Sequence, residues 1–308
     1  MSTSPPSGVL IVDKPLGCTS FDVVARVRRI CGEKRVGHAG TLDPLATGVL
    51  PICLGSATRL IEFLADAGKE YRAVVRLGAT SATYDGEGPI TEQLTDPARL
   101  PEAAALAAAL ARFRGPQQQR PPMHSAVQQG GQRLYELARR GLTVERQPRS
   151  ITIYQLELLA YTPPDVALQI ECSKGTYIRS LAHDLGAALG CGAYLAGLIR
   201  TRHGPFRLAE ALPLPALEAA VQAGALGQVL RPADSLVGDW PRVDVSAEAG
   251  RRLAQGQPLA YPSPAADAPR RLRVYGPAAQ LLALVYWEAA KARWQPVKVF
   301  AESSGKPG

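Results

Sequence analysis

The apolar positions of the first eighty residues follow two periods, that of a strand and that of a helix. Residues 9–12 form a short apolar run that stops at a Pro- and Gly-containing segment, which is typical of a buried strand ending in a turn. Thr19 and Asp22 then have the spacing of a capping box, and the apolar residues after them predict a helix through Cys31. Residues 70–77 carry apolar side chains at every second position, which predicts a half-buried strand.

Later segments predict further elements of both kinds. They are strands at residues 49–54 and 166–172, and helices at residues 58–64, 96–113 and 178–186. Because glycine commonly follows the last turn of a helix, the third of these helices is expected to end at Gly186.

Two stretches differ in composition from the rest of the chain. Residues 117–149 are rich in Gln and Arg and contain a Pro-Pro pair and paired glycines, which predicts an exposed insertion with a short helix near residues 134–140. After about residue 240 the pattern changes to a short helix capped by Ser246, followed by several strand-like runs. This change predicts a small, mainly β domain at the C-terminal end.

The charge balance favours a polyanionic partner only weakly. The 308 residues include 35 Lys+Arg and 27 Asp+Glu, so the net charge is +8. Basic side chains displace counterions from nucleic-acid phosphates, and arginine binds phosphate through two nitrogens at once. Codon bias in a GC-rich genome would also raise the arginine content, together with glycine and proline.

Several classes of protein are not expected. The longest apolar run, residues 103–111, is too short for the roughly 20 residues that cross a bilayer, and residues 1–6 do not resemble a secretion signal. Five separated cysteines without a C-x-x-C pair fit a reducing cytosol. The four histidines are too scattered in the sequence to indicate a metal site. The sequence also lacks the motifs of phosphate-binding loops and of serine nucleophiles.

The glycine-rich segment 37–48 is the first candidate for chemistry. Pro44 forces Asp43 out of helical geometry, so the carboxylate of Asp43 can project from a loop. Asp-Pro pairs also begin ordinary turns, and from the residues alone this structural interpretation is favoured over catalysis.

Two further candidates are Tyr71 and Arg179. An accessible aromatic ring can stack on a base, although Tyr71 on the apolar face of its strand also fits a core residue. Arg179 is expected in the first turn of a helix, where its charge opposes the helix dipole. A carboxylate, a phosphate or a neighbouring surface Asp would compensate that charge.

Five segments of the chain occur in a recognisable order. They are DKPLGCTSFD (13–22), KRVGHAGTLDPLATGVLPICLG (34–55), KEYRAVVRLG (69–78), PPMHSAVQQGGQRLYELARRG (121–141) and CSKGTYIRSLAHDLG (172–186). Together they resemble the bacterial tRNA pseudouridine synthase B (TruB) family, which isomerises uridine 55 in the T-loop of tRNA. The resemblance covers about residues 8–207, and the C-terminal segment looks like the PUA-type RNA-binding domain of the same family.

The resemblance implies an α+β fold. A mixed, largely antiparallel sheet would form a pseudouridine synthase catalytic domain at residues 1–240, with an inserted thumb at about residues 117–149 that orders on bound RNA. Residues 241–308 would form a small, β-rich, PUA-like RNA-binding domain. Within the thumb, His124 and Gln128 stand where Tyr and Lys are frequent in the family, and these departures concern RNA contacts.

The resemblance also assigns roles to individual residues. The catalytic aspartate falls on Asp43, which reverses the preference for a plain turn. Tyr71 would stack on the target base, and Arg179 would pair with the catalytic carboxylate and keep it ionised. The full set of implied substrate-binding residues is His38, Tyr71, Tyr177, Arg179 and Leu198.

The implied reaction breaks the N1–C1′ bond of uridine, turns the uracil and joins C5 to C1′. Because it has no net redox change and needs no external energy, no cofactor is expected, and the scattered histidines give no reason to expect a metal. The implied partner is tRNA, bound through the T-stem-loop after the target uridine flips out of its stack. A cytoplasmic monomer without membrane contact or an obligate protein partner is expected. Two alternative functions remain open: a guide-RNA-dependent synthase of the dyskerin type, and a non-catalytic RNA chaperone or RNA-binding protein.

Overall fold

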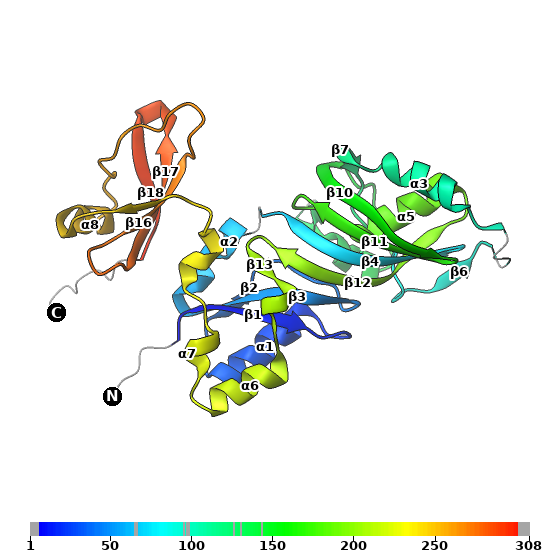
Figure 1. The fold of residues 1–308 in the computed structure, drawn as a ribbon, viewed down its shortest axis with the longest axis horizontal. Helices are drawn as coiled ribbons and strands as arrows, with labels where there is room; N and C mark the ends of the chain where they lie inside the picture. The colour runs from blue at the N-terminus through cyan, green and yellow to red at the C-terminus, as the bar shows by residue number, and fades with distance from the viewer. Residues whose placement is uncertain are drawn as a thin grey trace.

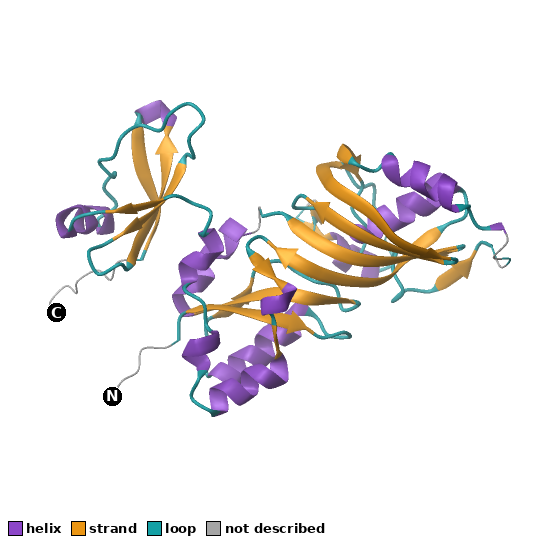
Figure 2. Ribbon diagram, in the orientation of Figure 1, coloured by secondary structure: helices purple, strands orange, loops and turns teal. Residues whose placement is uncertain are grey.

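Two separate sheets organise the chain (Figures 1 and 2). The structure is a computed structural model, and it describes residues 6–64, 67–94, 96, 99–125, 127–129, 131–142 and 144–300. The strands of the large sheet are β1 (Gly8–Lys14), β2 (Val36–His38), β3 (Ala46–Leu54), β4 (Lys69–Leu77), β7 (Gly115–Gln119), β10 (Arg149–Thr162), β11 (Asp165–Cys172), β12 (Ala193–His203), β13 (Phe206–Arg207) and β14 (Leu212–Pro213). The second sheet consists of β15 (Arg242–Asp244), β16 (Arg271–Tyr275), β17 (Leu281–Glu288) and β18 (Arg293–Val299).

Short strand pairs and helices complete the fold. The pairs are β5 (Ala79–Ser81) with β6 (Ile90–Glu92), and β8 (Gln128–Gln129) with β9 (Gln132–Arg133). The α-helices are α1 (Ser20–Cys31), α2 (Ile61–Leu64), α3 (Ala103–Ala111), α4 (Leu134–Arg139), α5 (Ile178–Leu189), α6 (Leu214–Gln222), α7 (Leu226–Val229) and α8 (Ala247–Ala254). The 3₁₀ helices are η1 (Gly55–Leu60), η3 (Leu208–Glu210), η4 (Ala233–Val237) and η5 (Ala289–Lys291).

The large sheet is mixed. Its strand order is β14-β1-β3-β12-β4-β11-β10-β7, with β2 beside β3 and β13 beside β12. The contacts of β1 with β14 and of β3 with β12 are parallel, whereas the other neighbours are antiparallel. Strand β12 therefore lies at the centre of the sheet, between β3 and β4. The prediction of an α+β fold with a mixed, largely antiparallel sheet is confirmed.

The two halves of the large sheet bury their residues differently. Helices cover both faces of β1, so Leu10 packs with α1 and α6, while Val9 packs with η1, η4 and Trp240. This two-sided burial explains the continuous apolar run at the start of the chain. Strand β4 is covered on one face by α5, and its side chains accordingly alternate between buried and exposed.

The first helix begins and ends as its sequence predicts. The backbone N–H of Asp22 donates to the Thr19 hydroxyl at 3.1 Å, and the N–H of Thr19 donates to the Asp22 carboxylate at 2.8 Å. Gly32 ends the helix in the left-handed conformation, with φ 64°. The predicted helix at residues 58–64 is instead a 3₁₀ helix followed by one α-helical turn, η1 and α2.

Two predicted helix boundaries are wrong. The helix expected from residue 96 begins only at Ala103, and part of the preceding segment, residues 97 and 98, lies outside the described residues. Helix α5 continues past Gly186 to Leu189 and ends at Gly190, with φ 72°. Gly186 is needed for a different reason, because a Cβ atom there would collide with the backbone of Ala193 on β12.

The two stretches of unusual composition fold as follows. Residues 117–119, the start of the predicted insertion, belong to the edge strand β7, and the short helix expected near residues 134–140 is α4. The C-terminal domain has its own four-stranded sheet, and Ser246 caps α8 as predicted. The ribbon in Figure 1 shows this sheet, in orange and red, beyond the large sheet. Among the helices of the described residues, none has the length and apolarity to cross a membrane.

Candidate active site

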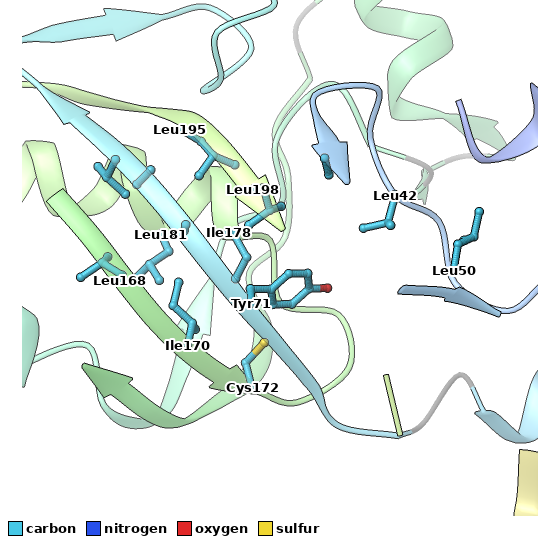
Figure 3. Packing of buried hydrophobic residues seen from close by; sticks show 14 of the residues in the cluster. Leu42, Leu50, Tyr71, Leu168, Ile170, Cys172, Ile178, Leu181, Leu195 and Leu198 are labelled. Atoms are coloured by element: carbon cyan, nitrogen blue, oxygen red, sulfur yellow. The ribbon is translucent and has the colours of Figure 1, made fainter. Parts of the chain in front are cut away.

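A cavity of about 520 Å³ lies where the loop between β2 and β3 meets β4 and the N-terminal end of α5. It is lined by Gly40, Thr41, Leu42, Asp43, Lys69, Tyr71, His124, Ser125, Gly175, Thr176, Tyr177, Ile178, Arg179 and Leu198. Figure 3 shows the Tyr71 ring projecting from β4 toward the side where Leu42 and Leu50 lie, with Leu198 and Ile178 near it. Segments from five parts of the sequence therefore share one concave site.

The loop that carries Asp43 is fixed by a turn and by α1. The N–H of Ala46 donates to the carbonyl of Asp43 at 3.0 Å, which closes a turn with Pro44 in its second position. The Ser20 hydroxyl, at the start of α1, donates to the Leu42 carbonyl at 3.0 Å and accepts from the Leu42 N–H at 2.8 Å. Asp43 thus begins a turn, as its Asp-Pro pair predicts, and it also lines the cavity, while its catalytic role stays a prediction.

The far side of this turn rests on the segment after β1. The carbonyl of Pro44 accepts hydrogen bonds from the N–H of Gly17 at 2.9 Å and from Nζ of Lys14 at 3.4 Å. Nζ of Lys14 also donates to the Pro15 carbonyl at 2.8 Å, and the Lys14 side chain is fully buried. Burial lowers the pKa of Lys14, against the opposing effect of nearby acidic groups that include Asp43. The first segment of the family resemblance therefore supports the Asp43 loop.

The carboxylate of Asp43 forms an ion pair with a buried arginine. Nε of Arg179 lies 2.9 Å from Oδ2 of Asp43, and only 6% of the Arg179 side chain is exposed, compared with 38% for Asp43. Burial raises the pKa of Asp43, the Arg179 cation opposes this rise, and the neighbouring carboxylate of Asp85 adds to it. Arg179 thus favours the ionised form of Asp43 in a site that otherwise disfavours it.

Arg179 also contacts a second carboxylate and the base of the insertion. Its Nη1 lies 3.5 Å from Oδ2 of Asp85, a side chain that is almost fully buried, and its Nη2 donates to the carbonyl of His124 at 2.8 Å. Asp85 in turn accepts a hydrogen bond from the Thr83 hydroxyl and one from the N–H of Glu87 at 3.1 Å. The arginine in the first turn of α5 is therefore compensated by two carboxylates.

Tyr71 and Leu198 contribute the apolar part of the cavity. Tyr71 lies on the apolar face of β4, and both side chains are largely buried while still lining the cavity. Burial raises the pKa of Tyr71 to about 12, so its hydroxyl is protonated at neutral pH. Tyr71 is accordingly both a core residue and a wall of the site.

Tyr177 is held by an amide side chain from the edge strand. The N–H of Tyr177 donates to Oε1 of Gln119 at 2.8 Å, and Nε2 of Gln119 donates to the Tyr177 carbonyl at 3.0 Å. The Ser180 hydroxyl donates to the carbonyl of Arg120 at 2.9 Å. These contacts and the Arg179–His124 bond join residues 119–124 to the start of α5.

Five of the six site residues expected from the sequence lie in this cavity, namely Asp43, Tyr71, Tyr177, Arg179 and Leu198. His38 does not line it; it lies on β2, and its contact with RNA stays a prediction. The sequence reasoning missed Asp85 and Gln119, because each meets the site only through pairing between distant segments. It also missed Lys69, although the family segment at residues 69–78 begins there.

Family models match most of the chain. The model described as TruB family pseudouridylate synthase, N-terminal domain, matches residues 28–178. The chain belongs to the TruB family. The tRNA pseudouridylate synthase B C-terminal domain matches residues 179–238, and the C-terminal model of tRNA pseudouridine synthase II matches residues 240–301.

Relatives of this TruB-family chain are similar over nearly their whole length. A tRNA pseudouridine synthase B of Dehalococcoides mccartyi is 47% identical over 300 residues, which are 97% of this chain and 98% of the relative. The protein of the same name in Ralstonia pickettii is 45% identical, over 93% of this chain and 92% of its own.

Solved structures support the same fold. The structure of an H/ACA RNP bound to a substrate RNA containing 2′-deoxyuridine matches with a TM-score of 0.72 and 27% identity, over 96% of this chain and 85% of that one. A Cbf5-Nop10-Gar1 complex matches with a TM-score of 0.72 and 28% identity, over 96% and 84% of the two chains. The TruB-family chain therefore has the pseudouridine synthase fold, and the prediction of that fold is confirmed.

Proposed function

We propose that this TruB-family chain isomerises uridine 55 in the T-loop of tRNA to pseudouridine, with Asp43 as the catalytic carboxylate. The relatives named tRNA pseudouridine synthase B support the activity, since they are 45–47% identical to this chain over most of its length. The observation that carries the residue assignment is the carboxylate of Asp43, which lines the cavity and is paired with Arg179 at 2.9 Å.

An ionised carboxylate is the reactive group that this isomerisation needs. It can attack C1′, add to C6 of the uracil, or remove a proton from the ribose, and each route starts from the charged form of Asp43. The Arg179 cation favours that form by opposing the rise in the pKa of Asp43 that burial causes. The reaction moves a glycosidic bond within one nucleotide without net redox change, so it needs no oxidant.

The cavity would receive the base after it leaves the helical stack. Flipping a uridine out of a folded T-loop costs a few kcal/mol, which contacts in the site must offset. Tyr71 offers an aromatic face in the cavity, and Leu198 and Ile178 extend its apolar wall. Tyr177, which also lines the cavity, would complete the enclosure of the nucleotide.

The proposed partner is tRNA, bound through its T-stem-loop by one copy of the chain. No obligate protein partner is needed in this proposal, and the reaction would take place in the cytoplasm, where tRNA is available. The net charge of +8 supports a polyanionic substrate. His38 and residues 117–149 would contact the RNA around the flipped uridine, and residues 241–308 would add a further RNA contact.

The deciding experiment incubates the pure protein with an unmodified tRNA transcript and maps pseudouridine by chemical labelling. We expect pseudouridine at position 55 without other proteins and none in a transcript that carries cytidine there. Product that appears only after a guide RNA and accessory proteins are added would favour the dyskerin-type alternative. Binding without product under every condition would favour an RNA chaperone.

The matched variant is Asp43→Asn, which keeps the shape of the side chain but cannot carry its charge. We expect it to lose turnover, to bind tRNA nearly as the wild type does, and to melt at a temperature at least as high. The last expectation follows because burial raises the pKa of Asp43, so its charge disfavours folding at neutral pH. Turnover near the wild-type rate in this variant would contradict the assignment of Asp43.

A further inference from the structure

Arg200 is a third buried cation at the Asp43 loop, besides Lys14 and Arg179. It lies on β12, and its side chain has no exposed surface. Its Nε donates to the carbonyl of Val49 at 2.8 Å, its Nη2 to that of Gly40 at 3.0 Å, and its Nη1 to that of Thr41 at 3.3 Å. One guanidinium therefore binds the backbone on both sides of Asp43.

The backbone of the loop also rests on the strand that carries Arg200. Arg200 pairs with Gly48 in the parallel register of β12 with β3. Gly40 and Gly48 have φ values of +95° and +99°, and a Cβ at either position would run into β12, at His203 and at the backbone of Arg200 respectively. The two ends of the loop thus lie against β12 so closely that both positions require glycine.

The same arginine faces Tyr71 across the sheet. Arg200 and Tyr71 are directly opposite each other in the antiparallel register of β12 with β4. The Arg200 cation lowers the pKa of Tyr71, against the larger rise that burial causes. Arg200 therefore contacts the two segments that supply the carboxylate and the aromatic wall of the cavity.

A buried guanidinium is costly unless its donors are satisfied, and here backbone carbonyls do this. Within the described part of the chain, Arg200 forms no ion pair with a carboxylate. Burial and the Arg200 cation hold the pKa of His203 well below its ordinary value, so this histidine is neutral at neutral pH. Because His203 is neutral, Arg200 carries the positive charge where β12 contacts the Asp43 loop.

We propose that Arg200 is a positioning residue for the isomerisation, which fixes the Asp43 loop against β12 and holds it in register with Tyr71. The proposal rests on the proposed function, because it concerns the geometry of that reaction. Its physical basis is that a displacement of about 1 Å in a reacting group can lower a rate about 100-fold. Arg200 would act through Asp43 and Tyr71 without touching the substrate.

The test is the variant Arg200→Lys, which keeps a buried positive charge but cannot donate to three carbonyls in a fixed fork. We expect a single-turnover rate of the folded protein at least about tenfold lower than that of the wild type, with tRNA affinity little changed. The melting temperature is expected to fall as well, because lysine leaves part of the buried carbonyls without a donor, so rates are compared where circular dichroism shows the variant to be folded. Because a looser loop weakens the Asp43–Arg179 pair, the acid limb of the pH–rate profile is expected to move to higher pH.

The control is Arg202→Lys, the same substitution two residues later in β12. Arg202 is also largely buried, but its guanidinium pairs with Glu70 and Glu171 rather than with the loop. Its rate and acid limb are expected to stay at the wild-type values.

Three outcomes would overturn the proposal, and a fourth would contradict the proposed function instead. A folded Arg200→Lys variant with the wild-type rate would overturn it, as would a rate that falls equally at every pH in proportion to a loss of folded protein. If Arg200→Lys does not fold at the assay temperature, the two rates are compared at a lower temperature where circular dichroism shows the variant to be folded, and a wild-type rate there would overturn the proposal. A wild-type protein that forms no pseudouridine would instead contradict the proposed function, which separates the two failures.

Discussion

The ion pair of Arg179 with Asp43 makes a quantitative prediction for the variant Arg179→Met. This substitution removes the cation that lies 2.9 Å from the Asp43 carboxylate and leaves the carboxylate of Asp85 nearby. An arginine in contact with an aspartate lowers its pKa by about 1–3 units. Since burial already raises the pKa of Asp43, the loss of Arg179 should raise it by a further amount of about that size.

The sign of the effect on the rate follows from the active form of Asp43. If the ionised carboxylate starts the reaction, the rate falls about tenfold for each pH unit below its pKa. The acid limb of the single-turnover profile should therefore move upward by about 1–3 pH units in Arg179→Met. At a pH well below that limb the variant should be about 10- to 1000-fold slower, and part of this deficit should disappear as the pH rises.

The same substitution has a cost in stability. Asp85 is buried and would lose its charged partner, and breaking a buried ion pair in this way costs about 3–5 kcal/mol. The rates must therefore be measured at a temperature where circular dichroism shows the variant to be folded. Arg179→Lys is the control, since it keeps the charge and should shift the acid limb less.

Two results would contradict this reasoning. A folded Arg179→Met variant whose acid limb coincides with that of the wild type would mean that Arg179 does not control the ionisation of Asp43. A slower rate with an unchanged pH profile in both variants would mean that Arg179 acts by binding the carbonyl of His124, which joins the insertion to α5.

Two further variants test the walls of the cavity. Tyr71→Leu should lose turnover while the far-ultraviolet circular dichroism spectrum is kept, because an aliphatic side chain fills part of the space but offers no ring to a base; a collapsed spectrum would show that Tyr71 matters mainly to the core. Gln119→Leu should lower the melting temperature and the single-turnover rate together, since it removes both hydrogen bonds to the Tyr177 backbone at a cost of about 1–3 kcal/mol. Normal tRNA turnover in a folded Gln119→Leu variant would show that the position of Tyr177 does not limit the reaction.

The sequence predicts the elements whose patterns are local. The capping box of Thr19 and the alternation of β4 are both found in the structure, because each depends on residues close together in the chain. Strand β10 was not predicted, although it spans 14 residues. Its pairing with β11 shifts register near Ile153 and again near Leu158, and these irregularities interrupt the period of two that identifies a strand.

The residues of the candidate site also divide into those that the sequence could place and those that only the tertiary structure places. Asp43 and Tyr71 could be placed because family segments surround them, and local patterns alone favoured a turn and a core position. Asp85 could not be found this way, since the segment around it looks like an ordinary turn. Asp85 joins the site through pairing with β12. The N–H of Gly86 donates to the carbonyl of Leu195 at 3.0 Å, and this hydrogen bond helps to place the neighbouring Asp85 beside Arg179.

Part of the positive charge of the chain is buried at the Asp43 loop, which the composition alone could not show. Lys14, Arg179 and Arg200 are all buried, and all three contact the loop that carries Asp43. A bound RNA brings phosphates that would raise the pKa of that carboxylate, and salt screens buried charges much less than exposed ones. Arg179 and Lys14, which both lower the pKa of Asp43, can therefore keep it ionised when the polyanion is bound, while exposed basic residues supply the salt-dependent part of the affinity. Raising the salt concentration should accordingly weaken tRNA binding far more than it changes the single-turnover rate at saturating protein.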